Sequence, residues 1–284
     1  MPLEQEAQPE GFRRYRLQGE DMTELTDIFD THAHYDDKAF DDDREVLLAG
    51  LPGHGITRVV NVGASLASCR RTIALTEKHD FIYGAIGIHP SGTAELEQEG
   101  AWQSLRELYR TEKCVAVGEI GLDYYWDEPE REIQKKWFVR QLDLARELGL
   151  PVIIHSRDAA RDTVDIMKVE RAGEIGGVVH CFSYTRETAR TFLDMGFFFG
   201  IGGVLTFRNA RKLREAVEYI PLERIVLETD CPYLAPVPYR GKRNSSLYLP
   251  YVAAALAQTK GIDEEAARRA VWENSVRLYR MEGL

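Results

Sequence analysis

The chain has 284 residues and a formal net charge of −10, with 44% hydrophobic and 29% charged residues. This is the composition of a folded globular protein with a sizeable core, and no apolar run approaches the ~18 residues that a membrane helix needs. The negative charge argues against a broad electrostatic surface for nucleic acid, although bound divalent cations would add positive charge locally.

The first residues are polar and lack periodicity. We therefore expect a flexible leader over residues 1–25, before a domain that spans residues 26–284. The N-terminus lacks the apolar core of a secretory signal. The four cysteines lie far apart and form no CxxC pair, which favours thiols in a reducing compartment. These features predict a cytoplasmic protein without a membrane association, and no obligate protein partner is evident.

Short β-rich runs alternate with helical segments from about residue 26 onward. The runs predict strands at 27–31, 58–62, 81–87, 114–119, 151–155, 177–180, 197–201 and 224–229. Ser65 is placed to cap a helix that carries Leu66 and Cys69 on one face. Apolar spacing predicts another helix over 131–147, which Gly149 would end.

Strands that alternate with helices form parallel sheets through right-handed crossovers. Eight such units in a chain of this length predict an α/β fold, a (β/α)8 TIM barrel in a single domain. An open doubly wound sheet is the alternative, but no glycine-rich phosphate-binding fingerprint follows the first strand. No linker or change of composition divides the chain.

Side chains of the metal-binding type stand at the ends of five expected strands. The candidate ligands are His32, His34, Glu119, His155, His180 and Asp230. Barrel enzymes keep their active sites at the carboxyl ends of the strands, so these residues should converge on one rim. The spacing of His32 and His34 turns both imidazoles to the same side of an extended segment.

Four histidines and two carboxylates form a mixed nitrogen and oxygen shell. Such a shell suits two divalent cations (Mg²⁺, Mn²⁺ or Zn²⁺) that share a bridging carboxylate, for which Glu119 is best placed. Each residue also has a purely structural interpretation. A single histidine at a strand end is commonly a core or loop residue, Asp230 could cap a turn, and Glu119 could be a buried ion-pair partner.

Two further residues of the expected rim are candidates for binding substrate. His89 follows the third strand, and Arg157 follows His155 and could bind a phosphate in a bidentate manner. Alternatively, His89 is a turn residue held by Pro90, and Arg157 pairs with Asp158 or with an acidic residue of the eighth helix.

Other residues near the rim leave more than one interpretation open. Strand alternation would turn Cys181 into the core, whereas Cys231 stays open as a ligand. The basic stretches 208–214 and 240–243 could contact a polynucleotide or form solvated surface. Tyr124 and Tyr125 could stack on a base or pack within their loop.

Six motifs along the chain resemble the TatD family of metal-dependent deoxyribonucleases, a branch of the amidohydrolase-like barrels. They are FDTHAHYDD, GAIGIHP, VGEIGLDYY, PVIIHSRDA, HCFS and ETDCPYLAPVPYRGKRN. The resemblance implies that His32 and His34 bind a first cation near Asp230, and that His155 and His180 bind a second. Glu119 would bridge the two.

The activity that the resemblance implies is hydrolysis of DNA phosphodiester bonds, including trimming of single strands from the 3′ end. A metal-activated water would attack the phosphate, with Glu119 and Asp230 as the catalytic residues. DNA, through single-stranded ends, is then the expected partner.

The chain departs from the family pattern in two places. Tyr184 stands where glycine is common, and Ser245, Ser246 and Leu247 stand where a proline-containing turn is common. The alternative function is therefore that of an amidohydrolase-like enzyme that hydrolyses a small ester, amide or lactone. A binding module without activity is disfavoured, because unpaired buried polar groups would destabilise the fold.

Overall fold

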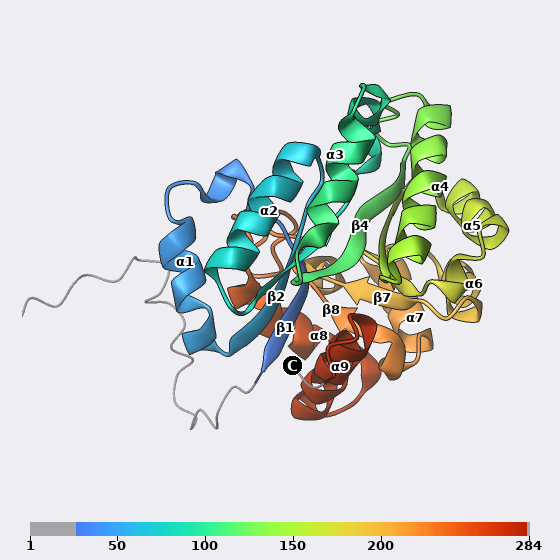
Figure 1. Ribbon diagram of the computed structural model, residues 1–284. Helices are drawn as coiled ribbons and strands as arrows, with labels where there is room; N and C mark the ends of the chain where they lie inside the picture. Colours follow the sequence, from blue (N-terminus) through green and yellow to red (C-terminus); the bar gives the residue numbers. More distant parts are fainter. Residues whose placement is uncertain (1–26, 283–284) are drawn as a thin grey trace, which may run out of the picture.

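Eight parallel strands form one sheet in which neighbours along the chain are also neighbours in space (Figure 1). The computed structural model describes residues 27–282, so the expected leader lies outside the described residues. The strands are β1 Ile28–Ala33, β2 Ile56–Val62, β3 Ile82–Ile86, β4 Cys114–Asp123, β5 Val152–Arg157, β6 Gly177–Val179, β7 Phe198–Ile201 and β8 Ile225–Leu227. All eight expected strands are confirmed.

The sheet closes on itself between β1 and the segment that follows β8. The main-chain N–H of Asp230 donates to the carbonyl of His32 at 2.9 Å, and the N–H of His34 donates to the carbonyl of Cys231 at 2.9 Å. Ala33 and Cys231 also form an isolated parallel bridge. This seam makes the sheet a closed (β/α)8 barrel and excludes the open doubly wound alternative.

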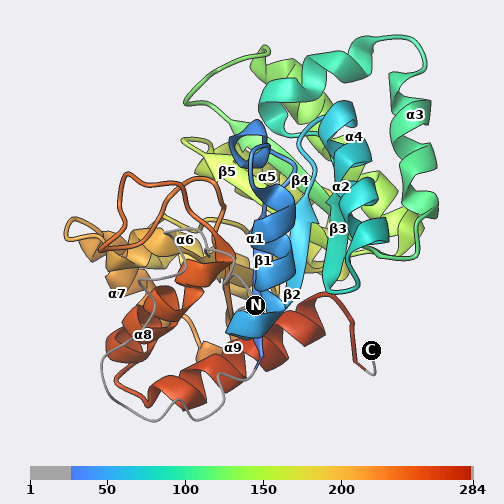
Figure 2. The same cartoon turned by 90° about the vertical axis from the view of Figure 1, so that its left-hand side faces the viewer.

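The helices lie around the strands (Figures 1 and 2). Those of the described residues are α1 Arg44–Gly50, α2 Leu66–Lys78, α3 Ala101–Glu107, α4 Arg131–Leu148, α5 Ala160–Val169, α6 Arg186–Asp194, α7 Arg211–Tyr219, α8 Leu249–Lys260 and α9 Glu264–Leu278. Ser65 caps α2 by accepting from the N–H of Ser68, as expected. Gly149 ends α4 with a left-handed φ of 67°. Within residues 27–282, no helix is both long and apolar enough to cross a membrane.

The barrel interior is a buried apolar cluster to which every strand contributes. Its strand residues are Phe29, Val60, Val62, Ala85, Val115, Ala116, Ile153, Val178, Phe198 and Val226. Residues from all eight strands can meet only inside a closed barrel. Tyr279 and Met281, which follow α9, belong to the same cluster, and the Tyr279 hydroxyl donates to the carbonyl of Thr31 at 2.7 Å. A larger cluster joins the strands to the outer helices.

Several strand ends differ from the expected ones. β4 runs four residues beyond Glu119, so this residue lies within the strand and not at its end. β3 pairs with β4 only as far as Val117, whereas β4 pairs with β5 up to the partners Asp123 and Arg157. The two strands therefore continue beyond the barrel as a two-stranded extension. β8 ends earlier, three residues before Asp230.

Candidate metal centre

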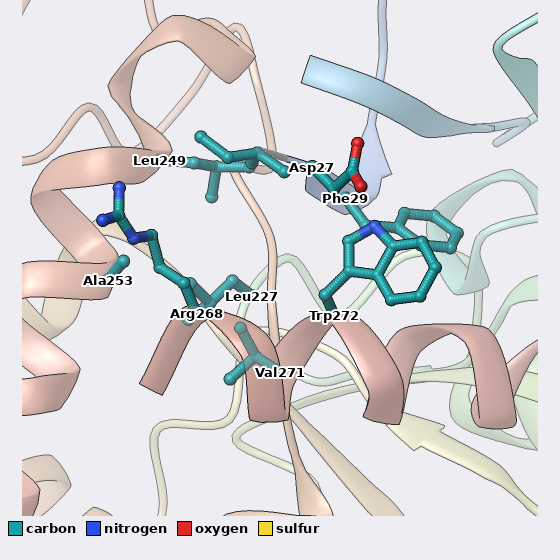
Figure 3. Close-up of a pocket in the computed structure, with 9 residues that line it drawn as sticks. Asp27, Phe29, Leu227, Leu249, Ala253, Arg268, Val271 and Trp272 are labelled. Atoms are coloured by element: carbon teal, nitrogen blue, oxygen red, sulfur yellow. The ribbon is translucent and has the colours of Figure 1, made fainter. Parts of the chain in front are cut away.

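A cavity of about 1100 Å³ lies where the six candidate ligands converge. Five of them line it directly: His34, Glu119, His155, His180 and Asp230. A second recess lies between β1, β8 and the helices α8 and α9 (Figure 3) and holds only about 10 Å³. That is room for about one water molecule. A substrate can therefore bind only in the larger of these two cavities.

Glu119 lies buried at the centre of the converging side chains. Its Oε1 is 2.6 Å from His155 Nδ1 and 3.4 Å from His180 Nε2. Its Oε2 is 3.4 Å from His32 Nε2 and 3.8 Å from His34 Nε2. The two oxygens thus face two different pairs of imidazoles, which is the arrangement that a bridging carboxylate requires.

His32, His34 and Asp230 form one group of donor atoms. The Nε2 atoms of the two histidines are 3.1 Å apart, and Asp230 Oδ1 is 3.3 Å from His34 Nε2. His34 Nδ1 donates to the carbonyl of Val62 at 2.8 Å, which leaves the Nε2 lone pair for the cavity. The third separation, from His32 Nε2 to Asp230 Oδ1, is 3.9 Å. The three values lie around the separation of about 3.3 Å between donor atoms of a tetrahedral shell with bonds of about 2.0–2.1 Å.

Three buried polar atoms next to the site form no hydrogen bond among the described residues. They are His32 Nδ1, His180 Nδ1 and Glu228 Oε2, although His180 Nδ1 lies within ion-pair distance of Glu228 Oε1, at 3.1 Å. An unpaired buried polar atom is costly, and a cluster of imidazoles and carboxylates is the donor set of Zn²⁺, Mn²⁺ and similar ions. These side chains therefore fit bound divalent cations.

His89 and His155 form a second group of donor atoms with Glu119. His155 Nε2 is 3.1 Å from Asp123 Oδ2, so the imidazole lies between two carboxylates. His89 Nδ1 accepts from the N–H of Ser91, which places the hydrogen of the neutral ring on Nε2, 4.0 Å from Glu119 Oε1. His89 in this tautomer is a hydrogen-bond donor to the cavity.

Glu228 is a site residue that the sequence reasoning missed. It is buried in the segment after β8, and its Oε1 is 3.1 Å from His180 Nδ1 and 2.5 Å from the N–H of Cys181. A Cβ at Gly200 in β7 would lie 2.1 Å from Glu228 Oε2, so glycine is needed there. Glu228 thereby fixes His180, whose ring stacks on that of His32 at 3.7 Å.

Cys181 lines the cavity, and its expected place in the core is wrong. Its φ of 45° interrupts the alternation on which the expectation depended. Cys231 is buried in the core and belongs to none of the donor groups of the described residues. The thiol of Cys181 adjoins His180 and Glu228.

The electrostatics of the cluster set the charge on each side chain. Burial opposes protonation of His34, but the nearby Asp230 and Glu119 outweigh it and raise its pKa to about 9. Burial is likewise outweighed at His180, where Glu228 and Glu119 raise the pKa to about 10. Burial lowers the pKa of His89 to about 3, with help from His155. Without a cation, the site thus holds protons between imidazoles and carboxylates.

Arg157 lies at the mouth of the cavity, at the end of the β4–β5 extension. Its guanidinium stacks on the ring of Tyr125 at 3.8 Å, and no carboxylate within residues 27–282 forms an ion pair with it. The expected alternative, a pair with Asp158, is therefore not formed. Tyr124 packs within its loop and donates to Asp162 at 2.7 Å.

The two basic stretches are largely engaged in structural contacts. Arg243 forms an ion pair with Asp43 at 2.6 Å, and Arg211 pairs with Glu215 at 2.9 Å. Arg214 donates to main-chain carbonyls, including that of Phe207. These contacts indicate that the two basic stretches belong to the surface structure and do not form a polynucleotide-binding surface.

The two departures from the family pattern have structural roles. The Tyr184 hydroxyl donates to the carbonyl of Ser156 at 2.9 Å, and its ring packs on the core. Ser246 donates to the buried Asp30 at 2.6 Å, and Asp30 also accepts from the hydroxyl of Thr229 at 2.7 Å. Ser246 thus ties the segment after β8 to β1.

Comparison of the sequence with known proteins shows the family. Residues 29–280 match the family described as TatD related DNase. The chain belongs to the TatD family. It is 43% identical to the uncharacterized metal-dependent hydrolase YabD of Bacillus subtilis, over 89% of this chain and 99% of that protein. It is 36% identical to the uncharacterized metal-dependent hydrolase YcfH of Escherichia coli K12, over 90% of this chain and 96% of that protein.

Solved TatD structures share the whole fold. The structure of YjjV, a TatD homologue from Escherichia coli K12, superposes with a TM-score of 0.83 at 31% identity, covering 90% of this chain and 99% of that one. A TatD family hydrolase from Entamoeba histolytica also superposes with a TM-score of 0.83, at 26% identity, covering 90% of this chain and 99% of that one. This TatD protein is therefore a metal-dependent hydrolase built on a (β/α)8 barrel.

Proposed function

We propose that this TatD protein hydrolyses phosphodiester bonds of DNA, working from the 3′ end of single strands, with two divalent cations (Mg²⁺, Mn²⁺ or Zn²⁺). The observation that carries the proposal is the position of Glu119, whose two oxygens face separate pairs of imidazoles 2.6–3.8 Å away. The name of the family supports DNA as the substrate.

In the proposed site, each cation has its own ligands. His32, His34 and Asp230 would hold the first, His155 and His180 would hold the second, and Glu119 would be shared between them. Two cations in this position would lower the pKa of a water molecule and neutralise charge on the scissile phosphate.

Three residues of the chain would act on the substrate or on the attacking water. Asp230 is kept ionised although its side chain is only 17% exposed, because His34 and His180 lower its pKa, so its carboxylate can accept a proton from water. His89 is neutral and donates from Nε2 into the cavity. Arg157 provides a planar guanidinium that can bind a phosphate oxygen pair.

The cavity favours a polymer end over a small ester, amide or lactone. Its volume of about 1100 Å³ exceeds the range of about 300–1000 Å³ that is typical of small-molecule sites. Arg157 and Lys38 also line it, while Arg71 pairs with Asp36 at 3.2 Å, and cations at the mouth suit a chain with several phosphates. The four cysteines are free thiols, which supports the cytoplasm as the compartment.

Hydrolysis of a 5′-labelled single-stranded oligonucleotide tests the proposal. The wild type should shorten it stepwise with Mg²⁺, Mn²⁺, Co²⁺ or Zn²⁺, whereas Glu119→Ala and Asp230→Asn should lose at least about 100-fold in kcat/KM. The exposed Glu99→Ala and Asp80→Asn serve as matched controls that keep full activity. Circular dichroism verifies that each variant is folded.

Two results would contradict the proposal. If DNA stays intact with all four cations while a carboxyl ester or lactone is hydrolysed, the alternative function holds. If both site variants keep the wild-type rate, the metal centre is elsewhere.

A further inference from the structure

Large aromatic side chains stand exposed at the mouth of the cavity. Trp126 is 64% exposed and Tyr233 is 54% exposed, and both line the cavity. A tryptophan with most of its surface in water forgoes the burial that usually stabilises such residues. Exposed apolar surface beside a functional site is typical of a binding surface.

The two rings belong to opposite sides of the barrel. Trp126 follows β4 and Tyr233 follows β8, and these strands are four places apart in a closed ring of eight. Glu119 comes from β4 and Asp230 from the segment after β8, so each ring stands beyond a carboxylate of the candidate metal centre. A substrate phosphate held at the metal centre would therefore have one aromatic ring on either side.

Contacts with residues of the site hold both segments in place. The main-chain N–H of Trp126 donates to Asp123 Oδ1 at 3.2 Å, and the ring of Tyr125 meets that of Trp126 edge-on at 5.1 Å. The main-chain N–H of Tyr233 donates to the carbonyl of Asp230 at 2.9 Å. Its hydroxyl donates to Asp37 Oδ2 at 3.2 Å. The main chain of both segments and the hydroxyl of Tyr233 are thus held by contacts within the protein.

Cations stand beside these rings. The Arg157 guanidinium lies 3.8 Å from the centre of the Tyr125 ring, next to Trp126. Lys38 and Arg71 line the cavity on the side of β1, as Tyr233 does. Arg71 pairs with Asp36 at 3.2 Å, and carboxylates outnumber cations in the lining, so Arg157, Lys38 and the proposed divalent cations would supply the positive charge. Aromatic faces with cations beside them are the recognition chemistry of single-stranded nucleic acid, whose unpaired bases are free to stack.

We infer that Trp126 and Tyr233 are base-stacking residues that hold the nucleobases on either side of the scissile phosphate of a single strand. This inference rests on the proposed function and deepens it. The aromatic faces bind the bases whatever their identity, and the cations bind the flanking phosphates. The protein should therefore require bases near the cleaved bond but accept any sequence.

A pair of oligonucleotides tests the inference. One is a ten-residue thymidine strand, and the other has tetrahydrofuran abasic residues at its last three positions. Stacking predicts a wild-type kcat/KM that is about 5- to 100-fold higher for the strand with bases. Trp126→Ala and Tyr233→Ala should each lower this ratio, whereas Trp126→Phe and Tyr233→Phe should largely keep it. Val169→Ala, at an exposed site on α5, is the control with an unchanged ratio.

Binding is measured separately by fluorescence anisotropy of the labelled strands in EDTA, where no hydrolysis occurs. Equal affinity of the wild type for the two strands, together with equal kcat/KM, would overturn the inference. A wild type that hydrolyses neither strand would contradict the proposed function, and the anisotropy ratio would still decide whether the bases stack.

Discussion

At the scale of single residues, the buried carboxylate of Glu228 determines the orientation of the His180 imidazole. Glu228 Oε1 lies 3.1 Å from His180 Nδ1, so His180 directs Nε2 toward Glu119 and the cavity. Partners of this kind fix the tautomer and the orientation of a metal-binding imidazole. Glu228 itself is too far behind the ring to touch substrate, and we assign it a positioning role.

Replacement of Glu228 should weaken metal binding more than it weakens the fold. Glu228→Ala is expected to lower the affinity for Zn²⁺ about 10- to 100-fold, because His180 loses the partner that orients it. Competition with a chelating dye measures the affinity without any dependence on turnover. Glu228→Gln, which keeps the shape, should lose less. The exposed Glu223→Ala is the matched control, and an unchanged affinity in Glu228→Ala would refute the positioning role.

The sequence contains a signal for Glu228, although only residues at the expected strand ends were considered as ligands. Glu228 and Asp230 have the same i, i+2 spacing as His32 and His34, which places two side chains on one side of an extended segment. Asp123 lies four residues beyond the expected end of its strand, because nothing local to VGEIGLDYY shows that β4 pairs with β5 as far as Asp123 and Arg157. Cys181 was misplaced because a positive φ is invisible in the sequence.

Among elements, the seam between β1 and the segment after β8 is the least regular part of the barrel. Asp30 is buried there, and burial raises its pKa to about 6 although Ser246 and Thr229 donate to it. The hydroxyl of Ser246 also lies 2.7 Å from that of Tyr35. One carboxylate therefore ties β1 to the end of β8 and to the short 3-10 helix Ser246–Tyr248.

Loss of the Ser246 hydroxyl should destabilise the whole barrel. Ser246→Ala is expected to lower the free energy of unfolding by about 1–3 kcal/mol, because a buried carboxylate loses a hydrogen-bond donor. Urea unfolding followed by circular dichroism measures this loss. Ser245→Ala, one residue earlier, should be nearly neutral, since the hydroxyl of Ser245 does not contact Asp30. Equal stability of the two variants would argue against a role for Ser246 at the seam.

The alternation of strands and helices could be predicted from sequence, because each strand has its own apolar run and two helices have a local signal at one end, the cap Ser65 of α2 and the stop Gly149 of α4. The strand ends could not, because they depend on pairing with a neighbour. β4 runs on to Asp123 since β5 is there to pair with it, and β8 stops at Leu227 since the chain turns there into the seam. The motif residues converged as expected because every parallel strand delivers its carboxyl end to the same rim.

For the molecule as a whole, bound cations should raise the melting temperature by an amount that depends on pH. The ligands come from β1, β4, β5, β6 and the segment after β8, so a cation binds the folded chain and not the unfolded one. At a cation concentration 100 times the dissociation constant, the melting temperature should rise by about 5–10 °C. Chelation with EDTA should remove the gain.

The sign of the pH effect follows from the raised pKa values of His34, about 9, and His180, about 10. In the metal-free protein, their protonated forms stabilise the fold fully below an unfolded pKa of about 6.5. This stabilisation is lost as the pH rises through the pKa values that the two histidines have in the folded protein. Over the same range, protons compete less with Mg²⁺ for the imidazole nitrogens. The melting-temperature gap between Mg²⁺-loaded and metal-free protein should therefore widen from pH 7 to pH 9, and a narrowing gap would contradict the protonation pattern.

The closing seam also sets when the enzyme can become active during its synthesis. A ribosome delivers His32, His34, Glu119, His155 and His180 before it delivers Asp230 and Cys231, which complete the main-chain bonds to β1. Synthesis must then continue to Ser246, which donates to Asp30 in β1, and to Tyr279, which donates to the carbonyl of Thr31. Hydrolytic competence therefore cannot precede the delivery of Asp230, and the contacts that complete the barrel come from residues still later in the chain.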